Sequence, residues 1–402
     1  MYRYLRLNPA VMPGRGIADG IEAEGLDGFN PVTVSRRSAL VAGGLGLFAS
    51  SLPSNGASAQ PASAMALPDY PIGKTHELPS TKETVSSGVL DPTRGPAITV
   101  ESGDVVYYPN TWTHWGNEAK YGMTFEEREP IRKKYASGPY SNVGPVAVRG
   151  AVPGDMIELR FLKMRPIDWG WTSFPLGVGA LPNYFDRPYL RYMRFDADRE
   201  TTEFVSGVRL KLAPSQGIVA VQPAGDKPVS GILTGSWGGN LDLAELVVGT
   251  SLFLPVQRPG GLVWTADTNA LQSDGVVCQT GIESAMEDMR IQYILHKNVP
   301  HPEPVVETPT HWIAFGLGDN LDVALADCVV KTLKLGHRLS GLDERDLYAL
   351  YSLTASFRVT QYSNQTGSVY SSVPPKMIHA MLPKSIFSTD MRDRMSRALR
   401  PA

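Results

Sequence analysis

Hydrophobic and polar residues alternate through much of the chain with a period of two, which is the pattern of half-buried strands. The clearest run is MIELRFL at residues 156–162, which places the glutamate and the arginine on one face and the isoleucine, the first leucine and the phenylalanine on the other. Further strand-like runs lie at residues 97–112, 203–223, 250–256, 261–266 and 275–283. We therefore expect a mainly β fold whose strands each bury one face.

The period changes toward the C-terminal end. Apolar residues recur at intervals of three and four over residues 321–339, which predicts a helix that is capped by Asp319 and Asn320 and ends at Gly336. Aspartate and asparagine cap helix N-termini with their side-chain oxygens, and glycine tolerates the left-handed backbone that ends many helices. The predicted fold class is accordingly α+β, with the helices after the strands.

Other segments complete the predicted elements. We expect a short helix over residues 125–135 that breaks at Pro130, a helix over 342–357, a strand over 356–364 and an exposed terminal helix over 389–399. Residues 283–297 mix apolar and charged positions so that a helix and an amphipathic strand fit equally well. Periodicity alone does not separate the two, and both alternatives stay open.

The N-terminal region has the features of an export signal. Arg36 and Arg37 precede an uncharged apolar segment, residues 39–52, which is too short to cross a bilayer as a stable helix. Small residues follow at 57–59 and 62–64, where a signal peptidase could cut. The paired arginines favour the twin-arginine route. We therefore expect residues 1–64 to be a signal region and the protein to be periplasmic or secreted, with no stable membrane span.

Composition narrows the class of protein. The 402 residues are 42% hydrophobic and 19% charged, which suits a chain that buries a large core. Because 38 basic residues balance 40 acidic ones and no basic stripe stands out, we expect no nucleic-acid partner. The 39 glycines and 32 prolines fit a turn-rich β protein. Residues 65–88 read as an extended lead-in, and residues 89–402 as the functional region.

Residues 231–283 concentrate the candidate chemistry. Short apolar strands alternate there with loops that carry six polar side chains: Asn240, Asp242, Asp267, Asn269, Gln272 and Asp274. Gly238 and Gly239 let the backbone approach whatever those side chains hold, because glycine has no Cβ. The alternative is that the Gly-Asn and Ser-Asp clusters are ordinary turns, in which these residues are common for local backbone reasons.

The order of motifs resembles the acetamidase/formamidase family of amide hydrolases. The motifs are GGNLD at residues 238–242, LPV at 254–256 and DTNALQSDG at 267–275, followed by Cys278 and Glu283. The resemblance covers roughly residues 90–384 and implies a β-sandwich or jelly-roll-like core with C-terminal helices. It also implies hydrolysis of the carbon–nitrogen bond of a linear amide to a carboxylic acid and ammonia.

Several positions depart from the family pattern. The family usually has a histidine just before the Gly-Gly-Asn motif, where this chain has Ser236 and Trp237, and a second one where it has Asn269. The usual Gly-Asp-Gly-Glu reads Ser-Asp-Gly-Val at residues 273–276, and Ser356 lies where an aspartate usually precedes the Arg-x-Thr-Gln segment. These losses weaken a zinc site in particular, because a site of oxygen ligands prefers harder ions.

Other hydrolytic mechanisms lack their motifs. The chain has no G-x-S-x-G, no H-E-x-x-H and no C-x-x-C sequence. Cys278 lies in an apolar run, where a thiol usually acts as a small hydrophobic residue. Cys278 and Cys328 are the two cysteines, and whether they form a disulfide stays open.

These observations predict a carboxylate-centred site that binds a divalent metal ion, with zinc, calcium and magnesium as the candidates. The predicted metal ligands are Asp242, Asp267 and Asp274. The predicted catalytic residues are Asp267, Asp274, Glu283 and Asn269. The predicted substrate-binding residues are Asn240, Trp237, His114 and Gln272. His114 lies between Trp112 and Trp115, where a packed structural histidine is the alternative to a functional one.

Two functions follow from the sequence. The first is an exported amidase whose metal-activated water attacks a small-molecule amide, with Glu283 or an aspartate as general base. The second is a periplasmic binding protein on the same fold with an eroded catalytic site, because Asn269 cannot act as a base near neutral pH. The position of the three aspartates and Glu283 distinguishes the two functions. The amidase requires these carboxylates to converge on one cavity that is open to solvent. Homo-oligomerisation stays open.

Overall fold

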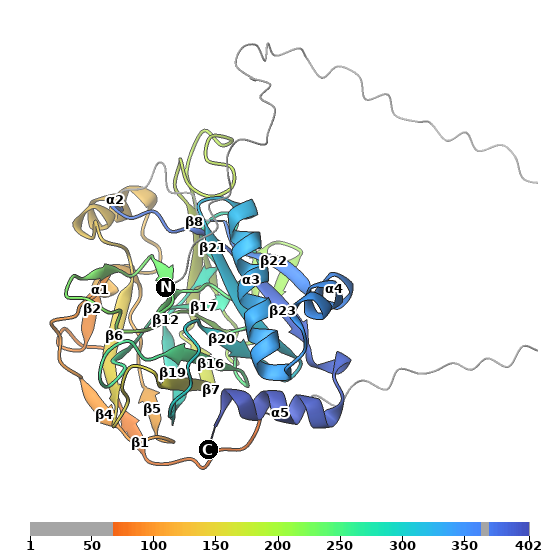
Figure 1. The fold of residues 1–402 in the computed structure, drawn as a ribbon. Coiled ribbons are helices and arrows are strands. Elements are labelled where there is room, and N and C mark those ends of the chain that lie inside the picture. Colours follow the sequence, from red (N-terminus) through yellow and green to blue (C-terminus); the bar gives the residue numbers. More distant parts are fainter. Residues whose placement is uncertain (1–66, 363–369, 402) are drawn as a thin grey trace, which may run out of the picture. The chain divides into compact units, whose positions relative to one another are not determined.

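The computed structural model describes residues 67–362 and 370–401 (Figure 1). The predicted signal region, residues 1–64, lies outside the described residues. Two large sheets make up most of the described chain. The nine-stranded sheet of the described part contains, in spatial order, β1 (Thr75–Glu77), β5 (Val105–Tyr108), β19 (Met286–His296), β7 (Met156–Pro166), β16 (Ser251–Pro255), β20 (Val305–Glu307), β21 (His311–Gly318), β23 (Lys376–Pro383) and β22 (Ser356–Gln361).

The second sheet carries the polar loops. Its ten strands in the described residues are β14 (Thr234–Gly235), β15 (Gly238–Asn240), β12 (Ser215–Val221), β17 (Val263–Leu271), β18 (Ile282–Glu283), β8 (Trp169–Phe174) and β9 (Tyr189–Arg194), with β6 (Ser141–Val148) paired to β17, β2 (Val85–Ser87) and β4 (Ile98–Val100). Two small pairs add β10 (Thr201–Val205) with β11 (Val208–Lys211), and β3 (Val89–Leu90) with β13 (Val229–Ser230). The expected mainly β fold with C-terminal helices is confirmed.

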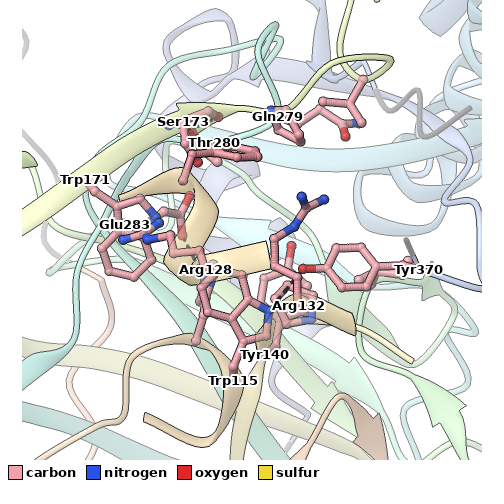
Figure 2. A pocket seen from close by; sticks show the side chains of 16 residues that line it. Trp115, Arg128, Arg132, Tyr140, Trp171, Ser173, Gln279, Thr280, Glu283 and Tyr370 are labelled. Carbon is pink, nitrogen blue, oxygen red and sulfur yellow. Dashed lines mark hydrogen bonds and ion pairs between the residues drawn. The ribbon is translucent and has the colours of Figure 1, made fainter. Parts of the chain in front are cut away.

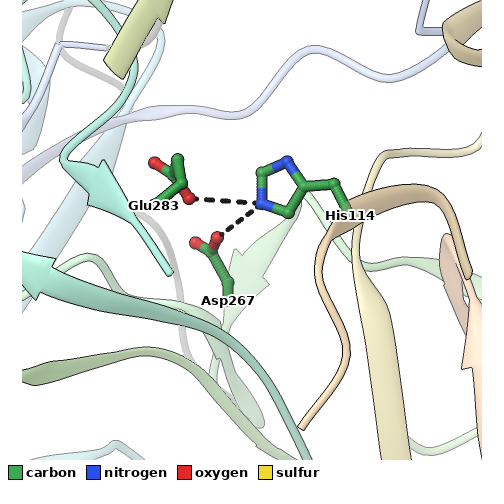
Figure 3. Close-up of side chains that lie close together, drawn as sticks. All are labelled: His114, Asp267 and Glu283. Carbon is green, nitrogen blue, oxygen red and sulfur yellow. Dashed lines mark hydrogen bonds and ion pairs between the residues drawn. The ribbon is translucent and has the colours of Figure 1, made fainter. Parts of the chain in front are cut away.

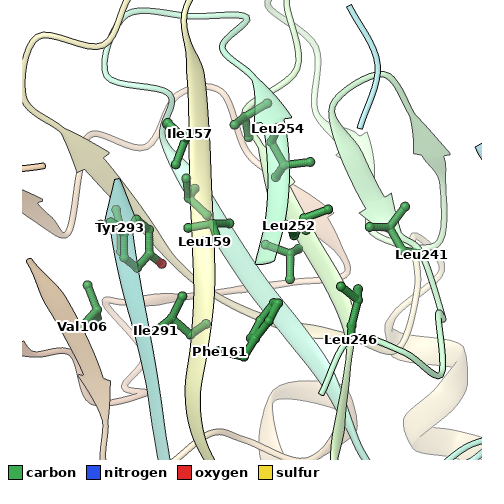
Figure 4. Close-up of a cluster of buried hydrophobic side chains, with 14 of the residues drawn as sticks. Val106, Ile157, Leu159, Phe161, Leu241, Leu246, Leu252, Leu254, Ile291 and Tyr293 are labelled. Carbon is green, nitrogen blue, oxygen red and sulfur yellow. The ribbon is translucent and has the colours of Figure 1, made fainter. Parts of the chain in front are cut away.

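The main core lies between the two sheets (Figure 4). Ile157, Leu159 and Phe161 of β7 contribute to it from one sheet, and Val219 and Val263 from the other. All five side chains are buried, and each fully buried aliphatic or aromatic side chain stabilises the fold by about 1.5–3 kcal/mol. The side chains of residues 156–162 therefore alternate as predicted, between this core and the opposite face of the sheet.

The opposite face of β7 holds a buried ion-pair network. Glu158, which is inaccessible to solvent, contacts Arg160 at 2.8 Å, His296 at 2.8 Å and Arg400 at 2.7 Å. Arg400 also lies 2.6 Å from Glu307, which is equally inaccessible. Buried charges persist when they are paired in this way. The network ties the C-terminal end of the chain to the nine-stranded sheet.

Helix α3 (Leu321–Ser340) packs on β21 and β23 of that sheet. The close approach requires Gly316 of β21, because a Cβ there would lie 2.1 Å from the backbone nitrogen of Cys328. The helix is capped by Asn320, as predicted, but the predicted end at Gly336 is wrong. Gly336 lies inside the helix, where its missing side chain makes room for Tyr351, and the helix ends at Gly341 in the left-handed conformation.

The other helices differ in detail from expectation. Helix α2 (Phe125–Lys134) continues through Pro130 rather than breaking there, and a capping box of Thr124 and Glu127 fixes its start. Helix α4 (Glu344–Thr354) begins after Asp343, as predicted. The terminal helix α5 (Thr389–Leu399) buries two side chains, so it is an amphipathic helix rather than an exposed one. A one-turn helix, η1 (Lys384–Ile386), precedes it.

The structure resolves two alternatives that the sequence left open. Residues 283–297 form strand rather than helix, because β19 pairs with β5 on one side and β7 on the other and points Met289, Ile291 and Tyr293 into the core. Cys278 and Cys328 are both free thiols. The lead-in also contributes strands β1 and β2, one to each large sheet. No helix in the described ranges is long and apolar enough to span a membrane.

Candidate active site

His114, Asp267 and Glu283 meet although they come from distant parts of the chain (Figure 3). His114 begins the short turn α1 (His114–Asn117), Asp267 lies in β17, and Glu283 lies in β18. The imidazole Nε2 is 3.2 Å from Asp267 Oδ1 and 3.2 Å from Glu283 Oε2. Their side chains are 12%, 4% and 6% exposed respectively. One imidazole nitrogen therefore faces two buried carboxylates.

The backbone of α1 is unusual and sets the position of His114. Trp115, Gly116 and Asn117 follow one another with φ values of 57°, 60° and 68°. Left-handed backbone at a residue other than glycine is uncommon and costs of order 1–3 kcal/mol. Thr113 holds the turn by donating its hydroxyl to the side chain of Asn117 at 3.0 Å. The surrounding structure thus maintains a strained turn that directs His114 toward the carboxylates.

Asp267 is also held in a left-handed conformation, with φ of 54° inside strand β17. Pairing of Gln216 with Thr268 and of Ile218 with Ala266 places Gly217 of β12 opposite it. A Cβ on Gly217 would lie 2.5 Å from the Asp267 carbonyl oxygen and 2.6 Å from its Oδ2. Glycine is therefore required at residue 217 for Asp267 to adopt its position.

Asp242 is the second acid of the same group. It lies directly after β15 with φ of 43°, and its backbone N–H donates to the carbonyl of Gly217 at 3.1 Å. Its carboxyl group is hydrogen-bonded to that of Asp267 and to the side chain of Asn240. Gln272 also holds Asp242 in place, because its side-chain N–H donates to the Asp242 carbonyl oxygen. Two of the three predicted aspartates therefore come together, and Glu283 joins them through His114.

The pair of aspartates holds a proton near neutral pH. Burial, and then the charge of Asp267, raise the pKa of Asp242 well above its ordinary value. Burial and the charge of Glu283 raise the pKa of Asp267 to about 7, although contact with His114 opposes the rise. Asp242 is consequently the protonated partner and Asp267 the one that ionises near pH 7.

The imidazole carries the compensating positive charge. Burial lowers the pKa of His114, but contacts with Asp267 and Glu283 outweigh burial and raise it to about 9. The Nε2 proton is hydrogen-bonded to Asp267, so Glu283 Oε2 has no hydrogen bond of its own among the described residues. Burial and three nearby carboxylates raise the pKa of Tyr140 well above its ordinary value, which keeps its hydroxyl protonated.

A small pocket opens onto this group (Figure 2). His114 and Glu283 line it, and its cavity volume of about 90 Å³ exceeds the roughly 10–15 Å³ that one water needs. Aromatic and cationic side chains form much of the remaining wall: Trp115, Tyr140, Trp171, Tyr370, Arg128 and Arg132. A smaller depression that shares Tyr140 in its wall is lined by Asn240 and Asp242. The space suits a ligand of few atoms.

Asp274 lies outside this group, contrary to the predicted set of three aspartates. It lies with Glu245 and His379 in a second cluster of potential ligands. Arg358 contacts Glu245 at 3.3 Å and Asp274 at 3.4 Å. The sequence placed Asp274 near Asp267 because only seven positions separate them, but the chain leaves β17 at Leu271 and carries Asp274 toward β22, where Gly275 bridges Gln361.

The remaining predicted residues have different surroundings. Asn269 is fully buried, lines neither pocket, and has no hydrogen-bond partner for either amide atom in the described ranges. Trp237 packs beside Leu90, Ala220 and Trp264 and lines neither pocket. Gln272 contacts the backbone of Asp242 rather than a pocket. None of these three side chains therefore lines either pocket: Gln272 holds the backbone of Asp242, and Trp237 and Asn269 are part of the interior.

The group of three fits a divalent metal ion. One atom each from His114, Asp267 and Glu283 lies within 4.8 Å of the others, and Glu283 Oε2 is buried without a hydrogen bond in the part of the chain that the structure describes. One nitrogen and two carboxylate oxygens form a donor set that zinc accepts. The predicted site contained only oxygen ligands, and His114 changes that donor set.

Comparisons with known proteins agree with the fold and with the family resemblance. The sequence model of the Acetamidase/Formamidase family matches residues 140–231. The solved acetamidase from Bacillus halodurans shares 24% identity and a TM-score of 0.69, covering 78% of this chain and 98% of that one. The acetamidase from Yersinia enterocolitica shares 22% identity and a TM-score of 0.68, covering 80% and 94%. A search of curated proteins found no match.

A γ-lactamase from Delftia acidovorans shows the same fold at greater distance, with 18% identity, a TM-score of 0.54 and coverage of 79% of this chain and 94% of that one. At these identities the likeness shows the fold. The family match over residues 140–231 bears out the resemblance to the acetamidase/formamidase family, and it lies upstream of the motifs at residues 238–283 that first indicated that resemblance.

Three residues of the site carry no signal in the sequence. Gly217 lies in an ordinary strand sequence, Tyr140 directly precedes β6, and Arg128 lies in a helix made mostly of charged residues. None belongs to a motif. Only the pairing of β12 with β17 and the packing of α2 against the pocket bring them to the site.

Proposed function

We propose that this protein hydrolyses the carbon–nitrogen bond of a linear amide to a carboxylic acid and ammonia. The observation that carries the proposal is the Asp267 carboxyl, which has a pKa of about 7, shares a proton with Asp242 and contacts a histidine that lines a small pocket. A general base works best when its pKa lies near the working pH. The family match supports amide hydrolysis as the class of reaction.

The carboxyl pair supplies the proton transfers. In the proposed reaction the ionised Asp267 takes a proton from water as the water oxygen bonds to the amide carbon. The protonated Asp242 then gives its proton to the nitrogen as the carbon–nitrogen bond breaks, and ammonia leaves. The acid product retains the water oxygen, and the proton that Asp267 received restores the shared proton of the pair.

Tyr140 and the aromatic wall complete the environment. The raised pKa of Tyr140 keeps its hydroxyl a donor, and the ring lies edge-on to His114 with centroids 5.3 Å apart. We propose that this hydroxyl donates to the amide oxygen as negative charge develops on it, which is the most effective place for a preorganised donor. Trp171, with its ring centroid 5.1 Å from that of His114, limits the water that enters.

We also propose that His114, Asp267 and Glu283 hold a divalent metal ion, with zinc the best match to their donor atoms. A divalent ion at such a site polarises a carbonyl and lowers the pKa of bound water. The Nε2 proton of His114 and the ion would compete for the same place, because that proton points at the same carboxylates. Binding would therefore require His114 to be neutral.

The experiment is ammonia release by the purified full-length protein from formamide, acetamide and propionamide, before and after dialysis against a chelator. Hydrolysis that is lost with the Asp267→Asn substitution supports the proposal. Sensitivity to the chelator, reversed by Zn²⁺, supports the metal. Ammonia release that is unchanged both by the chelator and by the Asp267→Asn substitution would contradict the assigned site.

One observation favours the alternative of a ligand-binding protein on this fold. Asn269 is buried at a position where the family usually has a histidine, and its amide cannot act as a base. Under this alternative, amides would bind and no ammonia would be released. Isothermal titration with acetamide beside the ammonia assay separates the two functions.

We further propose export through the twin-arginine route, from the pair Arg36–Arg37 and the apolar segment after it. Replacing both arginines with lysine should keep the protein in the cytoplasmic fraction of a bacterial host. Unchanged export of that double variant would contradict the proposed route.

A further inference from the structure

Arg128 contributes a buried positive charge to the wall of the pocket. Helix α2 places it there, 2% exposed, among three aromatic rings. Its guanidinium carbon lies 4.6 Å from the centre of the Trp171 ring, 5.0 Å from Tyr192 and 5.7 Å from Trp115. Cation–π contacts of this kind attract the charge to the rings and fix the plane of the guanidinium. Figure 2 shows Arg128 beside Trp171 and Glu283.

The guanidinium lacks the partner that other buried cations of this protein have. Arg160, Lys384 and Arg400 each lie 2.6–2.8 Å from a buried carboxylate. No carboxylate of the described residues lies within 4.0 Å of Arg128, whose Nε donates only to the Tyr192 hydroxyl at 3.1 Å. Its Nη2 is buried and has no hydrogen-bond partner among the described residues. An unpaired donor on a buried cation is costly.

The other charges around the pocket do not satisfy Arg128. The neighbouring Arg132 is already paired with Glu129 at 2.6 Å. The charge of Glu283 on β18 acts on Arg128 through space, but Glu283 Oε2 lies 3.2 Å from His114. The pocket therefore has an unpaired cation at Arg128, while His114 and Glu283 of the candidate active site line the same cavity. Acetamide, whose one carbonyl oxygen accepts from Tyr140 in the proposed reaction, has no second acceptor and no negative charge to offer Arg128.

We propose that Arg128 binds a carboxylate, so that the substrate is an amide whose other end is anionic: the half-amide of a short dicarboxylic acid. Guanidinium and carboxylate form charge-assisted, often bidentate hydrogen bonds, and the aromatic cage already holds the planar donor in place. The cavity volume of about 90 Å³ limits the spacer to a few carbons. The amide end of this substrate rests on the proposed function, whereas binding of a carboxylate at Arg128 does not depend on it.

The test compares matched substrates that differ only in charge. Ammonia release is measured with malonamate and succinamate, which carry a carboxylate, and with malonamide and succinamide, which do not. We expect kcat/KM for the charged member of the better pair to exceed that of its neutral counterpart by about tenfold or more, as one charge-assisted hydrogen bond provides. Equal values, or a preference for the neutral amides, would overturn the inference.

Two variants and a control locate the effect. Arg128→Gln should reduce the charged-to-neutral ratio to about one, and Arg128→Lys, which keeps the charge on a flexible stem, should leave an intermediate ratio. Arg290→Gln is the control, because Arg290 also stacks on a tyrosine, with 4.9 Å to the Tyr107 ring, but lies outside the pocket. A ratio that Arg128→Lys and Arg128→Gln both leave unchanged would overturn the proposal, and circular dichroism verifies the fold of each.

A binding measurement separates this inference from the proposed function. Succinate is titrated calorimetrically into the wild-type protein, Arg128→Gln and Arg290→Gln, without any reaction. Binding that weakens about tenfold or more with Arg128→Gln and is unchanged with Arg290→Gln supports the carboxylate site even if no amide is hydrolysed. Hydrolysis of acetamide with no Arg128-dependent binding of succinate would overturn the carboxylate site and leave the amidase proposal standing.

Discussion

The carboxyl groups of Asp242 and Asp267 are hydrogen-bonded to each other beside Gly217, where a Cβ would lie 2.6 Å from Asp267 Oδ2 and 3.0 Å from Asp242 Oδ1. Both aspartates have a positive φ, of 43° and 54°, which few residues other than glycine adopt. Backbone strain of this kind persists where the surrounding structure holds it, and it clusters at functional sites. Two acids that lie far apart in the sequence thereby form one proton-sharing pair.

Gly217→Ala should disable this pair. A Cβ would lie 2.5 Å from the Asp267 carbonyl oxygen, so the backbone of β17 must shift and carry the carboxylate with it. Displacement of a catalytic group by about 1 Å costs on the order of a hundredfold in rate, and we expect kcat/KM for ammonia release to fall by that order. The control is Gly95→Ala, because a Cβ at Gly95 meets nothing within 4 Å. An active Gly217→Ala protein would show that the position of Asp267 is not critical.

The stability of the metal-free protein should fall as pH rises from about 6.5 to 9. The pKa of His114 is about 9 in the folded state and 6.5 in the reference state, so its contribution is fully present below 6.5 and is lost as pH passes 9. The pKa of Asp267, raised to about 7, acts in the same direction, because the folded state again binds the proton more tightly. Urea unfolding in the presence of a chelator measures the change.

The histidine part of that change should be on the order of 3 kcal/mol, and it should disappear in His114→Gln. His76 supplies the control substitution, because it lies in β1, paired with Asp104 and away from the pocket. If the pH dependence survives in His114→Gln and disappears in His76→Gln, the effect comes from His76 and the prediction for His114 is contradicted.

Zinc binding should release protons. At pH 7 the Nε2 atom of His114 is protonated, since its pKa is about 9, and it must lose that proton to act as a ligand. Calorimetric titration with Zn²⁺ in two buffers of different ionisation enthalpy should therefore report at least about one proton released and a higher affinity at pH 8 than at pH 6. Asp274→Asn should leave this binding intact. Binding that depends on Asp274 and not on His114 would place the ion in the second cluster.

The sequence predicts the β fold well because strand alternation is a local property. Residues 156–162 divide their two faces as expected, and Asn320 caps α3 through its own side chain. Predictions are wrong where a distant contact decides. Gly336 is a helix-ending residue by type, but the packing of Tyr351 against it keeps it inside α3. Residues 283–297 become strand because β5 and β7 flank them.

The site is predictable only in part for the same reason. Asp242, Asp267 and Glu283 could be singled out because they lie in recognisable motifs, whereas Asp274, in the same motif as Asp267, is carried to another cluster. Arg128 belongs to no motif, and its pocket exists only once α2 packs beside β8 and β18. Spacing along the chain therefore identifies candidate groups, and tertiary packing decides which of them meet.

The measurement that tests the central claim most directly is ammonia release by the full-length protein and by two variants that carry the same chemical change, Asp267→Asn and Asp274→Asn. Loss of a general base costs about 10²–10⁴ in rate, so we expect that loss in kcat/KM for Asp267→Asn with its best amide, at unchanged fold. Asp274→Asn, which is part of the other cluster, should stay close to wild type. Equal activity of all three proteins, or a loss confined to Asp274→Asn, would contradict the account.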